Sequence, residues 1–116
     1  MTAQGSPRAI FERAIGSGNL MVAEVILRTE IPRPTLVDLL ELTALIARKD
    51  PSRHDRVATR WLVRYLEARQ DATIDEAALA ATALERLGSG LHDQALAALR
   101  DMAEAASSRH ASTGVR

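Results

Sequence analysis

The charged residues with the clearest chemical meaning form a row of arginines between positions 53 and 64. This arginine stripe consists of Arg53, Arg56, Arg60 and Arg64. Their spacing of three or four residues places them along one face of a helix. Such a row of guanidinium groups binds carboxylates or phosphates, so the functional interpretation is docking to an acidic partner or a nucleic acid backbone. The simpler interpretation is a solvated face paired with the acids of residues 71–76. We favour it because rows of surface charge usually do no more than interact with water and form weak ion pairs.

Two His-Asp pairs, His54-Asp55 and His92-Asp93, are the next candidates for chemistry. An all-helical class of metal-dependent phosphohydrolases uses such a pair, together with a further upstream histidine and a downstream aspartate. No histidine precedes His54, so that ligand set is incomplete. Both pairs fall at predicted helix N-termini, where the helix dipole favours an aspartate. We therefore predict no metal site and no cofactor. The remaining alternative is a metal-dependent hydrolase in which the repeat brings both His-Asp pairs to one shared ion.

Other catalytic signatures are missing from the sequence. There is no cysteine, and no Gly-x-Ser-x-Gly motif marks a nucleophilic serine. The two Gly-Ser-Gly segments, 16–18 and 88–90, follow no predicted strand and are read as helix stops. The chain is thus predicted not to be an enzyme.

Composition indicates one all-α domain. The 116 residues are 47% hydrophobic with only three aromatics, so alanine and leucine supply most of the apolar volume. Such a core suits closely packed helices better than a sheet. Fourteen arginines against one lysine, with abundant alanine, is typical of bacterial genomes of high GC content. The zero net charge argues against a dedicated nucleic-acid binder. No secretory signal or membrane-spanning run is seen, so we expect a cytoplasmic protein without a membrane partner.

The most apolar predicted helix occupies residues 35–49, and the rest of the chain must be arranged around it. Thr35 and Asp38 have the spacing of a capping box, which marks the helix start. Apolar residues cover more than half of its circumference, and only Asp38, Glu41 and Arg48 define a wet strip. Neighbouring helices must therefore cover it on both sides.

Caps and breaks predict five further helices. Ser6-Pro7 opens the first, and a second capping box, Thr73 with Glu76, opens the fifth. Residues 1–5 are expected to fray, and the polar segment 107–116 is expected to be a disordered tail after a single domain 1–106. The predicted helices besides 35–49 cover residues 7–15, 20–29, 53–69, 73–88 and 91–106.

The second predicted helix carries apolar residues beyond one face. Met21, Val22 and Val25 lie off the face formed by its other apolar residues. They are either buried on a second side within the domain or exposed as a strip that meets another chain. Self-association as a homodimer through these three residues is therefore one hypothesis for the partner.

Short links make the helices antiparallel neighbours, in hairpins 7–30, 35–69 and 73–107. A shift of 38 residues superposes both capping boxes and both His-Asp pairs, which indicates an internal repeat. The second helices resemble those of tetratricopeptide repeats. The matching segments are Gly18-Asn19-Leu20-x-x-Ala23-x-x-x-Leu27 and Gly90-Leu91-His92-Asp93-Gln94-Ala95-x-x-x-Leu99. The first helices lack the Trp and Leu-Gly pair of that family. The resemblance implies a superhelical scaffold with a protein-binding groove.

These observations favour a small non-catalytic module that binds another protein. The expected fold is all-α, with six antiparallel helices in three hairpins that form a short α-solenoid or a compact bundle. The alternative is a nucleic-acid-associated regulator that uses the arginine stripe, with helix 53–69 as the reading helix. Against that alternative, Trp61 and Tyr65 are predicted to face the core rather than a ligand.

Overall fold

The computed structural model describes residues 6–89 and 91–115, with side chains described to residue 107. The described residues form an all-helical fold, as the sequence predicts. Residues 1–5, which are expected to fray, Gly90, which belongs to a predicted helix stop, and Arg116, the last residue of the expected tail, lie outside the described residues. The elements are α1 (Pro7–Ser17), α2 (Leu20–Thr29), α3 (Leu36–Lys49), the short 3-10 helix η2 (Pro51–Arg53), α4 (His54–Ala68), α5 (Ile74–Arg86) and α6 (His92–Val115).

Local capping chemistry sets the helix starts. Thr35 accepts a hydrogen bond from the Asp38 amide while the Asp38 carboxylate accepts one from the Thr35 amide, which completes the predicted capping box. Thr73 and Glu76 form the same arrangement before α5. The turn between α1 and α2 depends on Gly18, which adopts a left-handed conformation with φ of 74°.

Helix α3 lies at the centre of the molecule and is covered on two sides, as its apolar circumference predicts. On one side, α1 and α2 pack against it in a cluster that includes Phe11, Leu27 and Leu45. On the other side, a larger cluster built around Leu40 and Trp61 joins α3 to α4, α5 and α6. Each cluster buries a different face of the same helix.

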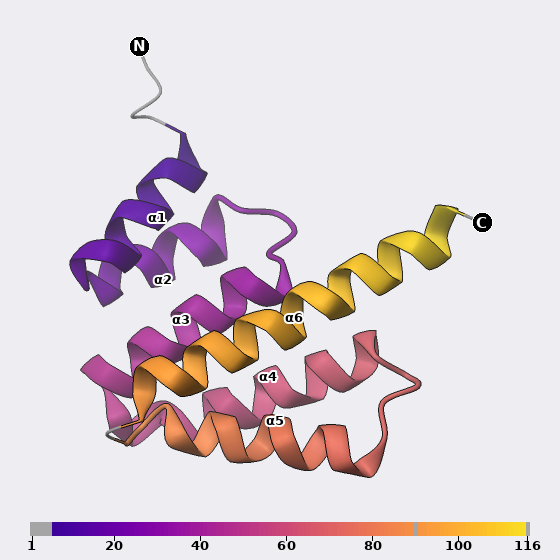
Figure 1. Cartoon of the computed structure of the whole chain (residues 1–116). Helices are drawn as coiled ribbons and strands as arrows, with labels where there is room; N and C mark the ends of the chain where they lie inside the picture. Colours follow the sequence, from indigo (N-terminus) through magenta and orange to yellow (C-terminus); the bar gives the residue numbers. More distant parts are fainter. Residues whose placement is uncertain (1–5, 90, 116) are drawn as a thin grey trace.

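The second and third hairpins close into a four-helix bundle. Helix α3 packs against α6 as well as against α4, and α4 also contacts α5 and α6 (Figure 1). The α1–α2 hairpin lies on the outer side of this bundle and contacts it through α3. The sequence left open a short α-solenoid or a compact bundle, and the last four helices form a bundle. Alanines buried in α5 and α6, including Ala80 and Ala103, allow these helices to approach closely.

Helix α6 is longer than the sequence analysis predicts. Its backbone is helical to Val115, whereas the sequence pattern predicts an end at residue 106 followed by a disordered tail over 107–116. The segment contains no proline, and its first glycine is Gly114, so nothing in it stops a helix that has already begun. The end of α6 projects beyond the other helices in Figure 1. No helix among the described residues is long and apolar enough to cross a bilayer.

Candidate functional site

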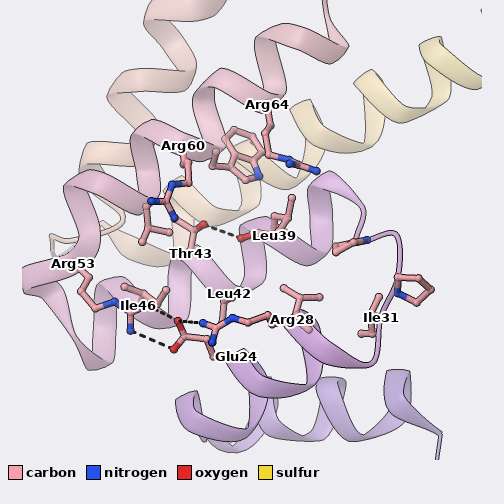
Figure 2. Close-up of a pocket in the computed structure, with 15 residues that line it drawn as sticks. Glu24, Arg28, Ile31, Leu39, Leu42, Thr43, Ile46, Arg53, Arg60 and Arg64 are labelled. Carbon is pink, nitrogen blue, oxygen red and sulfur yellow. Dashed lines mark hydrogen bonds and ion pairs between the residues drawn. The ribbon is translucent and has the colours of Figure 1, made fainter.

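A groove lies between α2 and α4, with α3 as its floor (Figure 2). We call it the α2–α4 groove. Its volume is about 380 Å³. The link between α2 and α3 closes one end, and the opposite end holds Arg53. Its lining residues are Glu24, Leu27, Arg28, Ile31, Pro32, Pro34, Leu39, Leu42, Thr43, Ile46, Arg53, Val57, Arg60, Trp61 and Arg64.

The apolar surface of this groove comes mainly from α3 and α4. Leu39, Leu42 and Val57 are half-buried, so part of each side chain is accessible from the groove. Trp61 lies beneath them with 2% of its surface exposed. Its indole N–H donates to the Leu36 carbonyl at 2.9 Å, and its ring stacks on Tyr65. The groove therefore offers aliphatic side chains to a ligand, whereas the Trp61 ring is buried and already stacked on Tyr65.

The structure divides the arginine stripe into residues with different environments. Arg53 belongs to η2 and points across the groove to Glu24 on α2, with which it forms a two-pronged ion pair, and it also approaches Asp50. Glu24 is paired with Arg28 as well, at 3.4 Å. The hydrogen bond from Arg53 lowers the pKa of Glu24 despite the partial burial of this carboxyl. One carboxylate thus pairs with two arginines and offsets one of their two positive charges.

Arg60 and Arg64 are the uncompensated cations of the groove. Both are exposed, both line it from α4, and neither makes an ion pair or hydrogen bond to any residue that the structure describes. Figure 2 shows them on the wall opposite Glu24 and Arg28. Arg56 is also exposed and without a described partner, but it does not line this groove. Positive charge is therefore left unpaired along one wall.

Two of the three acids in residues 71–76 pair with an arginine outside the stripe. Arg69 is 6% exposed and reaches both Asp71, at 3.1 Å, and Glu76, at 2.7 Å. The predicted pairing of the stripe with these acids is thus not found among the described residues. Arg69 instead joins the end of α4 to the start of α5.

Both histidines of the His-Asp pairs contact carbonyls at the end of α5. His54 is buried, and its Nε2 lies 2.8 Å from the Leu84 oxygen, so Nε2 carries the hydrogen that this carbonyl accepts. His92 Nδ1 lies 2.7 Å from the Leu87 oxygen. The described residues contain no cluster of three or more His, Cys, Asp or Glu that could hold a metal ion. The geometry gives both histidines a part in helix packing.

The predicted self-association strip is reduced by the packing of α2. Met21 is 76% exposed and Val25 is 47% exposed, one turn apart. Val22 is partly buried and packs against the cluster beneath the first hairpin. The exposed apolar strip therefore consists of Met21 and Val25 alone.

Two ion pairs that the sequence pattern does not predict lie on α3. Asp38, predicted to lie on a wet strip, is 5% exposed and accepts two hydrogen bonds from Arg8 of α1 at 2.8 and 2.7 Å. The Arg8 hydrogen bonds are the main reason that the pKa of Asp38 is lowered. Glu41, also assigned to that strip, is half-buried and pairs with Arg100 of α6. These pairs fasten α1 and α6 to the central helix.

Comparison of the chain with protein-family models, with curated proteins and with solved structures returned no match. The resemblance to tetratricopeptide repeats therefore remains a prediction from the sequence motifs.

Proposed function

We propose that this chain is a small non-catalytic interaction module that binds an acidic segment of another protein in the α2–α4 groove. The observation that carries the proposal is the combination of accessible aliphatic side chains with the unpaired guanidinium groups of Arg60 and Arg64. The groove lining contains four arginines and one glutamate, so its charge favours an anionic ligand. The resemblance to tetratricopeptide repeats also implies a partner that is a protein.

A peptide ligand accounts for the groove better than a nucleic acid. Proteins that bind single-stranded nucleic acid stack bases on accessible aromatic rings. Trp61, the aromatic residue in the groove lining, is almost fully buried and already stacked on Tyr65. The accessible groove residues Leu39, Leu42 and Val57 suit aliphatic side chains of a polypeptide.

The test is selection of binding peptides on the full chain. A displayed library of random peptides of about 16 residues, enough for four helical turns, is enriched on the wild-type protein. We expect enriched sequences that combine Asp or Glu with Leu, Ile, Val or Met. Their affinity should fall roughly tenfold for Arg60→Glu, because reversing a rim charge turns attraction into repulsion.

Arg56→Glu is the matched control, since Arg56 is also exposed on the same helix but does not line the groove. Its affinity for the enriched peptides should stay near that of the wild type. The proposal is wrong if the two variants behave alike. A single-stranded oligonucleotide that displaces the peptides, and whose binding is weakened equally by both variants, would instead support the nucleic-acid alternative.

A further inference from the structure

The walls of the α2–α4 groove restrict the backbone conformation of its occupant. Both walls and the floor are α-helices, whose backbone N–H and C=O groups are already paired along each helix. Among the lining residues, only the α2–α3 link at one end and Arg53 at the other lie outside α-helices. An extended segment laid across Leu39, Leu42 and Val57 finds no strand edge to pair with, so its own backbone groups lose water without gaining partners. A helical segment pairs its backbone internally and avoids this cost.

The two free arginines set a spacing along the groove. Arg60 and Arg64 are four residues apart on α4, which places their backbones about 6 Å apart along the helix axis. A helix packed beside α4 presents residues i and i+4 with the same separation. Two carboxylates four residues apart can therefore face both guanidinium groups together.

The two walls also differ in charge, which orients the occupant around its own axis. On the α2 wall, Glu24 pairs with both Arg28 and Arg53. On the α4 wall, Arg60 and Arg64 have no described partner. The acidic edge of a bound helix therefore belongs on the α4 side, and its apolar face belongs over the floor.

We propose, resting on the function proposed above, that the occupant is an amphipathic α-helix with acidic residues at positions i and i+4. Its carboxylates pair with Arg60 and Arg64, and its aliphatic face contacts Leu39, Leu42 and Val57. This assigns the partner segment a conformation, a charge spacing and an orientation in the groove.

The enriched peptides test this assignment directly. We expect Asp or Glu pairs four residues apart in their sequences. The dominant peptide, synthesised and titrated with the full-length chain, should gain helical circular dichroism on binding. Proline at its centre should weaken binding at least roughly tenfold, because proline disrupts a helix interior. A peptide of the same composition, with its two acids at positions i and i+2, should also bind more weakly than the selected peptide.

Trp61 supplies an independent signal of groove occupancy when the peptide contains no tryptophan, because it is the single tryptophan of the chain and lines the groove. The helical assignment is overturned if enriched peptides carry acids two residues apart, gain no helicity and tolerate proline, while Arg60→Glu still weakens them. That result leaves the proposed function standing. Equal affinity for wild type and Arg60→Glu overturns the proposed function itself.

Discussion

Individual side chains that join distant parts of this chain are mostly arginines bound to carboxylates of α3 or α2. Arg8 is 30 residues from Asp38, and Arg100 is 59 residues from Glu41. The sequence shows the charges but not their partners, because long side chains can reach several neighbouring helices. The capping partners Thr35 and Asp38 were predictable because they are three residues apart and need no tertiary information.

Removing the Arg8 side chain tests how much the ion pair with the buried Asp38 stabilises the fold. Arg8→Ala leaves Asp38 buried without its guanidinium partner, and we expect a loss of about 1–2 kcal/mol in the free energy of unfolding at pH 7. The value is below that for a fully buried pair because the Arg8 side chain is 47% exposed. Urea unfolding measures it, with Arg56→Ala as the control for loss of an exposed, unpaired arginine.

The same pair predicts a pH dependence. The pKa of Asp38 is lower in the folded chain, chiefly through its hydrogen bonds from Arg8. Its stabilisation is therefore complete above the unfolded value of about 4 and is lost as pH falls through the lowered folded value. The difference between wild type and Arg8→Ala should shrink as pH falls below about 4. A difference that stays constant down to pH values of about 2 would contradict this assignment.

Glu24 provides a residue-scale test of the groove. Glu24→Gln removes the carboxylate that pairs with Arg28 and Arg53, so the groove becomes more positive by one charge. We expect the acidic peptides to bind roughly three to ten times more tightly, a gain typical of one partly exposed charge. Isothermal titration measures the change. The variant's circular dichroism should match that of wild type. If this correctly folded variant binds the peptides with unchanged or lower affinity, the groove does not recognise their negative charge.

At the scale of elements, the six helices were predictable because periodicity and caps act over a few residues. The start of α2 at Leu20 and its end at Thr29 match the prediction. The end of α6 did not follow from composition, because a polar segment without a helix breaker is compatible with either state. The groove could not be predicted, since it depends on the placement of α2 and α4 on either side of α3.

Two glycines at the end of α1 make a matched test of helix termination. Gly18 has a φ of +74°, and an added Cβ would lie 3.0 Å from the Lys49 side chain, so Gly18→Ala should lower stability by about 1 kcal/mol or more. Gly16 is helical with open space around it, so Gly16→Ala should be neutral or stabilise by up to about 1 kcal/mol. Denaturant unfolding compares them. Equal effects would mean that Gly18 is not the residue that ends α1.

At the scale of the whole molecule, the reduction of the apolar strip on α2 bears on self-association. A stable interface buries about 800 Å² on each partner, far more than Met21 and Val25 supply. We therefore expect a monomer by light scattering after size exclusion, at both low and high salt. A salt-insensitive dimer that Met21→Glu converts to monomer would contradict this expectation and support the strip as an interface.

The four-helix bundle lies against the α1–α2 hairpin, and the α2–α4 groove formed by this arrangement has unpaired arginines on one wall. The most direct measurement of its role is a charge exchange between groove and peptide. Arg60→Glu is combined with a selected peptide in which the facing acid is replaced by lysine, and all four pairings are titrated. We predict that either single change weakens binding roughly tenfold and that the two changes together restore most of the affinity. If the two losses of affinity add, and no choice of the acid replaced by lysine restores binding to Arg60→Glu, the groove is not the binding site.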